Sequence, residues 1–184
     1  MARTVPVLAS EAPGNYLTGA LWNANLKALG DFLMNPPRCN LYSSVQQSLA
    51  HNISATLTFD TEVEDTDGGH STLTNTDRYT CQVPGVYLLT GQVNFAALNT
   101  TGLRLAEWRV TTAGGSASVP PGGESLLPPS ASQTLTIVLP PTYIRLAVGD
   151  YVQILALQTS GSPIAVGGGG GGTQTQMSCL WIAA

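Results

Sequence analysis

Short apolar runs, each bounded by turn-forming residues, fill the chain from residue 39 to its end. The runs are rich in valine, isoleucine, leucine, threonine and tyrosine, and clusters of glycine, proline, asparagine and aspartate separate them. This alternation is typical of antiparallel β-strands joined by turns, and no second long helical pattern interrupts it. We therefore expect an all-β sandwich or barrel-like roll of about ten strands. The candidate strands are 41–46, 53–59, 78–82, 85–97, 105–111, 116–119, 133–139, 143–146, 151–158, 163–166 and 176–182.

The first 38 residues follow a different pattern. Residues 1–17 contain prolines and no periodic face, which indicates an extended arm. In 18–34 the apolar residues recur at helical spacing, Thr18 can cap the helix, and Pro36 ends it. We therefore expect two parts, an arm and anchor helix at 1–38 and a β domain at 39–184. The apolar face of the helix consists of Trp22, Leu26, Leu29 and Leu33, widened by Leu21 and Phe32.

Two expected strands, 85–97 and 151–158, are apolar on both faces. A lone sandwich of this length buries less apolar surface than such strands present, so we expect a homotrimer that covers the second face. The residues expected in these core and trimer-forming strands are Tyr87, Leu89, Val93, Phe95, Tyr151, Ile154 and Leu155, with Trp181 in the last strand.

Two glycine-containing segments predict specific loops. Gly149-Asp150 lies between two apolar runs and is a signal for a tight hairpin. Residues 167–172 are six consecutive glycines, which either form a flexible tip or lie where one backbone contacts another.

Several motifs of the β domain resemble the head domain of complement C1q and its relatives in the tumour necrosis factor jelly-roll superfamily. The resemblance covers about residues 41–184 and implies an antiparallel jelly roll that associates as a trimer around a threefold axis. It does not include the helix, and the collagen-like stalk of many relatives is absent. The matching segments are Phe59-Asp60, RYTC at 78–81, VPGVY at 83–87, LAVGDYV at 146–152 and SCLWI at 178–182.

The N-terminal segment is similar to virion proteins of tailed phages of actinobacteria. The similarity rests on ALWNAN at 20–25, ALGDFL at 28–33 and the following Pro36-Pro37. It implies an N-terminal anchor that carries the β domain on a particle. The apolar helix face could dock on such a partner, or it could fold back on the β domain as ordinary core.

Charged residues are scarce, at 10% of the chain, and Lys27 is the single lysine. So few cations cannot neutralise a phosphate backbone, and nucleic acid is not an expected partner. A net charge of −4 and the absence of any apolar run approaching about 18 residues make a membrane equally unexpected. The first residues lack the apolar stretch of about 7 to 15 residues that marks a secretory signal, so we expect no export by that route.

Catalytic motifs are absent from the sequence. His51 and His70 are the two histidines, and neither belongs to a recognisable nucleophile arrangement, so no enzyme activity and no cofactor are expected. Six of the eleven carboxylates lie in 60–77, where they could bind calcium or form a solvated loop. The spacing does not fit an EF-hand, and no metal site is expected. The cysteines are expected to be small buried residues, with a disulfide as the alternative, and they are Cys39, Cys81 and Cys179.

These patterns together predict a non-enzymatic virion structural protein, a trimeric capsid decoration or head-fibre protein assembled in the host cytoplasm. Its expected partners are two further copies of itself and a major capsid or other virion protein, which the arm and helix would bind. The alternative is a tail-fibre or receptor-binding knob that holds host cell-surface glycan. A secreted ligand of the complement-head type is a third hypothesis, which the missing signal disfavours.

Overall fold

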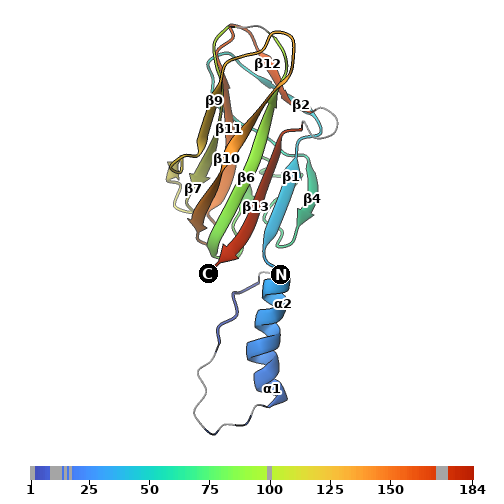
Figure 1. Ribbon diagram of the computed structural model, residues 1–184, viewed down its shortest axis with the longest axis vertical. Coiled ribbons are helices and arrows are strands. Elements are labelled where there is room, and N and C mark those ends of the chain that lie inside the picture. The colour runs from blue at the N-terminus through green and yellow to red at the C-terminus, as the bar shows by residue number, and fades with distance from the viewer. Residues whose placement is uncertain (1–2, 9–13, 15, 17, 99–100, 169–173) are drawn as a thin grey trace.

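The computed structural model describes residues 3–8, 14, 16, 18–98, 101–168 and 174–184. Two antiparallel sheets pack face to face as a sandwich, and a helical stem projects from one end of it (Figure 1). The C-terminus lies at the end of the sandwich that carries the stem. From this end of the sandwich, the N-terminal arm runs along the helix. The predicted all-β antiparallel sandwich with one helix is therefore confirmed.

The larger sheet has seven strands within the described residues. Its order is β2–β12–β6–β13–β1–β4, and β10 also pairs with β6. Their bounds are β1 (Arg38–Tyr42), β2 (Gln46–Leu49), β4 (Thr61–Asp65), β6 (Gly85–Phe95), β10 (Leu135–Leu146), β12 (Ile164–Gly167) and β13 (Gln176–Ala183).

The smaller sheet has six strands in the same described part of the chain. Its order is β3–β11–β7–β8, with β5 also paired to β11 and β9 to β7. Their bounds are β3 (Ala55–Thr56), β5 (Tyr79–Thr80), β7 (Arg104–Thr111), β8 (Ala117–Ser118), β9 (Glu124–Leu127) and β11 (Tyr151–Gln158).

The core lies between the two sheets. In β6 the residues Tyr87, Leu89, Val93 and Phe95 alternate inward and are fully buried, as expected for a central strand with period two. From the opposite sheet, the side chain of Trp108 enters the same layer and donates from Nε1 to the carbonyl of Pro140 at 3.3 Å. The sandwich thus closes its own apolar core within one chain.

The strand predictions were incomplete in three places. The acidic segment expected as a loop contains β4, which pairs antiparallel with β1. Residues 124–127, expected as loop, form β9 beside β7. The single expected strand 41–46 is two strands, β1 and β2, because the chain turns between them. Strands with few apolar residues at a sheet edge carry too weak an alternation to be recognised.

Two predictions about loops were wrong. Both depend on which strands pair with each other, and the paired strands lie far apart in the chain. Residues 133–139 and 143–146 form one long strand, β10, and Pro140-Pro141 sits in a bulge where a missing N–H is tolerated. Gly149, at a φ of +88°, does form a tight turn, but it connects β10 in one sheet with β11 in the other. It is therefore a crossing between sheets and not a hairpin. Most of the glycine run, residues 169–172, lies outside the described residues.

Candidate interaction surfaces

The stem is one continuous helix with an irregular middle turn. It comprises α1 (Gly19–Leu21), the π-helical turn η1 (Trp22–Lys27) and α2 (Ala28–Met34). The Thr18 hydroxyl accepts from the Leu21 N–H at 3.2 Å, and the helix ends at Asn35 ahead of the two prolines. The predicted helix, its cap and its stop are confirmed. The π turn was not anticipated, because a single extra residue per turn has no signature in apolar spacing.

The last turn of the helix belongs to the core of the sandwich. Phe32 is 5% exposed, and its ring meets Trp181 of β13 edge-on with centroids 4.9 Å apart. Sequence reasoning placed Phe32 at the margin of an anchor face. The structure places it in contact with the β domain, because the helix approaches the sandwich end-on.

Arg3 ties the arm to both other parts of the molecule. Its Nε donates to Asp67 Oδ1 at 2.7 Å, and its terminal nitrogens donate to the Thr66 hydroxyl at 3.1 Å and to the Asn35 carbonyl. The guanidinium also lies over the Phe32 ring, 5.8 Å from the centroid. The Asp67 side chain is almost completely buried, so this ion pair is shielded from water. Sequence reasoning missed Arg3, since its partner lies 64 residues away.

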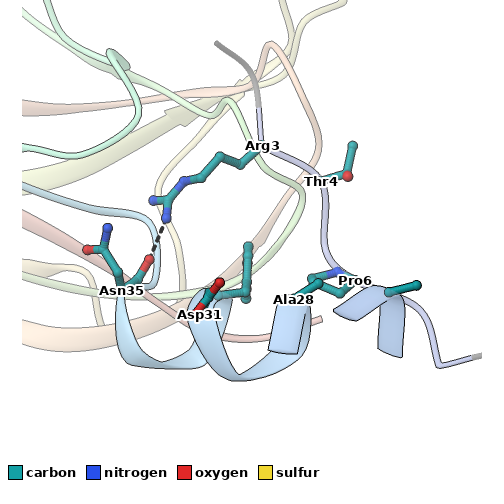
Figure 2. Close-up of a pocket in the computed structure, with 8 residues that line it drawn as sticks. Arg3, Thr4, Pro6, Ala28, Asp31 and Asn35 are labelled. Atoms are coloured by element: carbon teal, nitrogen blue, oxygen red, sulfur yellow. Dashed lines mark hydrogen bonds between the residues drawn. The ribbon is translucent and has the colours of Figure 1, made fainter. Parts of the chain in front are cut away.

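A groove of about 590 Å³ separates the arm from the helix. Figure 2 shows Arg3, Thr4 and Pro6 of the arm on one side and Ala28, Asp31 and Asn35 of the helix on the other. The arm thus runs along the side of the helix that carries Ala24, Ala28 and Phe32. Small side chains on this side allow the extended arm to approach.

The remaining apolar residues of the helix are open to solvent. Trp22 is 50% exposed, Leu26 is 45% exposed and Leu33 is 55% exposed. Leu21 and Leu29, the other two predicted anchor residues, are half-buried. These exposed apolar residues make this side of the helix a candidate interaction surface. On the arm, apolar residues are also exposed at Val7, Leu8 and Tyr16.

A second apolar surface lies on the open face of the larger sheet. Leu180 of β13 pairs with Leu88 of β6, which pairs in turn with Tyr143 of β10. Tyr143 is 68% exposed, and Leu180 is partly exposed. Arg38 of β1 continues the row on the other side of Leu180. The row crosses β1, β13, β6 and β10, which lie side by side in the larger sheet (Figure 1).

Most of the residues predicted for the core and trimer-forming strands occupy the interior of one chain. Tyr87, Leu89, Val93, Phe95, Ile154 and Trp181 belong to its core. Leu155 is also buried, but it lies on the outward face of β11 with Tyr151 and Gln153. The outward face of β11 is also covered locally. Tyr151 lies under the guanidinium of Arg78, 4.2 Å from its ring centroid, and the Gln153 amide donates to Asp77. The open apolar surface of this fold therefore comes from β6, β10 and β13 and not from β11.

The acidic segment 60–77 uses its carboxylates to build the loop. Asp65 accepts from the N–H groups of Gly68 at 3.0 Å and His70 at 2.8 Å. Glu64 accepts hydrogen bonds from Nε and Nη2 of Arg38, and these hydrogen bonds lower the pKa of the Glu64 carboxyl. Among the described residues, no three histidine, cysteine or acidic side chains gather in a way that could hold a metal ion.

The histidines and cysteines have structural surroundings. The ring nitrogens of His70 lie 2.8 Å from the Arg78 carbonyl and 3.1 Å from the Phe59 carbonyl, while His51 Nδ1 accepts from the Gly161 N–H. All three cysteines are free and buried, as expected from sequence. Burial raises the pKa of the Cys39 and Cys179 thiols far above the usual range, so neither is an activated nucleophile. No described helix is long and apolar enough to cross a membrane.

Comparison with known proteins identifies the fold. No protein-family model and no curated protein sequence matches the chain. Among solved structures, murine APRIL at pH 8.5 superposes with a TM-score of 0.58 and 13% identity, covering 79% of this chain and 98% of APRIL. Eiger TNF from S. frugiperda superposes with a TM-score of 0.58 and 14% identity, covering 80% of this chain and 94% of Eiger. The sandwich is thus a jelly roll of the tumour necrosis factor type, as its motifs predicted.

Proposed function

We propose that this protein is a non-enzymatic structural component of a phage particle. In this proposal it is a homotrimeric capsid decoration or head-fibre protein, assembled in the host cytoplasm and attached to the particle through its N-terminal stem. One observation carries the proposal. The jelly roll closes its own core, whereas the stem projects from its end with large apolar side chains exposed.

The fold and one apolar surface support self-association of the knob, by which we mean residues 39–184. Domains of this fold are typically homotrimers. In this chain the open face of the larger sheet carries an apolar row through Leu88, Leu180 and Tyr143, which a neighbouring copy could cover. Burial of such a row on assembly would remove apolar area from water, and each well-buried side chain would contribute about 1.5 to 3 kcal/mol.

The stem supports attachment to a particle. It resembles the N-terminal segment of virion proteins, and it places α1 away from the knob (Figure 1). The arm exposes Val7, Leu8 and Tyr16, and none of them is needed to close the jelly roll. An element of this kind can bury its apolar residues on a capsid without disturbing the fold of the knob.

The proposal is tested with particles of the phage that encodes this chain, stripped of the protein. Full-length chain is mixed with stripped particles and sedimented, in parallel with a variant lacking residues 1–28. This deletion retains Phe32 and its contact with Trp181, but it removes the Arg3–Asp67 ion pair, so circular dichroism checks that the knob remains folded. A matched control, Leu73→Asp, alters a residue that is 89% exposed on the knob.

We expect the full chain and Leu73→Asp to sediment with particles and the truncated chain to stay in the supernatant while remaining folded by circular dichroism. Undiminished decoration by the truncated chain would refute attachment through the stem. Binding of the full chain to host cells but not to particles would instead favour the receptor-binding alternative.

A further inference from the structure

The stem helix has two distinct sides. Ala24, Ala28 and Phe32 line the groove beneath the arm, together with Asp31 and Asn35. Trp22, Leu26, Leu29 and Leu33 line no part of that groove, and three of these four are about half exposed. The arm lies along one side of the helix, and within the described residues Trp22, Leu26 and Leu33 on the other side remain about half open to solvent.

The spacing of the four uncovered residues identifies a partner. From Trp22 to Leu26, Leu29 and Leu33 the intervals are four, three and four residues, the a and d spacing of a coiled coil. In the α-helical turns of 28–34 this register puts Asp31 at position f, opposite Leu29 and Leu33, and Asp31 lines the groove beneath the arm. Trp22 and Leu26 lie in the π turn Trp22–Lys27, which has more residues per turn than a coiled coil, and both side chains are exposed. We propose that the seam formed by Trp22, Leu26, Leu29 and Leu33 packs against the same seam of two further copies of this chain, as a short parallel three-helix coiled coil.

The charges of the helix are compatible with packing between identical copies. The positions that flank the seam, e and g, hold Asn23, Asn25, Gly30 and Phe32, and none of them is charged. The two charged residues, Lys27 and Asp31, lie off the seam and pair with each other within one helix. Parallel identical helices bring like residues close together, so a seam without flanking charges avoids repulsion between copies.

A coiled coil of two heptads is too short to be stable by itself, and a trimeric knob would hold its helices together. An isolated helix of this length is marginal in water, but a trimeric knob would hold three stems at high effective concentration. The seam is also continuous with the proposed knob interface. Leu180 of the apolar row of the larger sheet lies beside Arg38 of β1, which comes four residues after the helix ends at Met34. The inference rests on the trimer proposed above and adds the stem to its interface.

This assignment changes the predicted role of the helix face. Sequence reasoning gave Trp22, Leu26, Leu29 and Leu33 to the particle, whereas here they face the neighbouring copies. Attachment to the particle then falls to the outer surface of the stem, where the arm exposes Val7, Leu8 and Tyr16.

Disulfide trapping in the full-length chain tests the seam. Leu26→Cys and Leu33→Cys place a thiol at seam positions, and Lys27→Cys is the matched control, one residue along the same helix, exposed and off the seam. The three native cysteines are buried and do not compete. Each variant is oxidised with copper phenanthroline and analysed on a non-reducing gel, and light scattering on the reduced protein reports its oligomeric state.

We expect trimers for all three variants and about tenfold more covalent dimer for the two seam variants than for Lys27→Cys. A trimer whose seam variants cross-link no better than the control would overturn the coiled coil and leave the trimeric knob standing. A monomer in light scattering would overturn the proposed trimer and the seam with it.

Discussion

The ring of Phe32 stands edge-on to the indole of Trp181, with centroids 4.9 Å apart and planes at 86°. Phe32 is in the last turn of the stem helix, and Trp181 is in the last strand of the larger sheet. Trp181 also donates from Nε1 to the Pro84 carbonyl at 3.2 Å, which fixes the indole against the start of β6. The contact makes the end of the stem part of the core of the sandwich.

Replacement of Phe32 by alanine is expected to lower the free energy of unfolding by about 3 kcal/mol, because it removes a buried ring and leaves one face of Trp181 without a partner. Chemical denaturation followed by Trp fluorescence measures the change. Met34→Ala, at a neighbouring position that is 85% exposed, serves as control and should change stability by less than about 0.5 kcal/mol. Equal effects of the two variants would contradict the shared core.

Arg3→Ala is expected to release the arm from the helix. The substitution removes the donors to Asp67, Thr66 and Asn35, and it leaves a buried carboxylate without its cation, at a cost of about 1 to 3 kcal/mol. Hydrogen exchange should increase in residues 3–8 while β6 stays protected. Arg145→Ala is the matched control, because Arg145 is exposed and bonds only to the terminal carbonyl of Ala184 in the described contacts. Unchanged exchange in the Arg3 variant would show that other contacts hold the arm.

Glu124→Gln is expected to stabilise the protein at pH 7. Glu124 of β9 lies directly opposite Glu107 of β7, and burial together with this like charge raises the pKa of Glu107. A raised carboxyl pKa means that the folded state binds protons more tightly, so stability falls as pH rises from the unfolded pKa through the folded one. Neutralising Glu124 relieves a repulsion of about 0.2 to 1 kcal/mol. Thermal unfolding at pH 4 and pH 7 should show the gain at pH 7 and a smaller one at pH 4.

Asp60 is expected to contribute to unfolding in acid. Burial disfavours the charged form of Asp60, but hydrogen bonds from the N–H and hydroxyl of Ser44 and from Thr61 outweigh it and lower the pKa. A lowered pKa gives stability that is present above the unfolded value, near 4, and is lost as pH falls through the folded value. In Asp60→Asn the loss of stability between pH 6 and pH 3 should be smaller than in the parent chain. An unchanged pH profile would show that other carboxylates dominate.

Gly85→Ala is expected to prevent folding or to destabilise the chain severely. Gly85 begins β6 with a φ of +155°, and a methyl group there would lie 2.2 Å from Trp181 Nε1 and 2.4 Å from the Ala183 carbonyl. Both neighbours are held in the sheet and cannot give way. Gly115→Ala, at a turn with φ of +86° and nothing within 4 Å, is the control for backbone strain alone. Expression and circular dichroism should separate the two variants, and similar stability for both would contradict the close contact.

Local patterns were sufficient for most of the elements. The alternation in 85–97 and 151–158 predicts strands because side chains of a strand point to opposite faces in turn. Thr18 and the prolines after Asn35 define the helix, because capping and the loss of an N–H act within a few residues. The segments around Gly85 and Gly149 predicted the jelly roll through their resemblance to the complement and tumour necrosis factor superfamily.

What the sequence could not determine depends on contacts between distant residues. Gly149-Asp150 specifies a turn, but only the pairing of β10 with β6 and of β11 with β7 places its two flanks in different sheets. The helix period puts Leu33 within the apolar face and Phe32 at its margin, yet the end-on approach to Trp181 buries Phe32 and leaves Leu33 exposed. Local sequence determines where helices and strands form. Which elements pack together is decided by the burial of apolar area between residues far apart in the chain, and no short segment carries a signal for that.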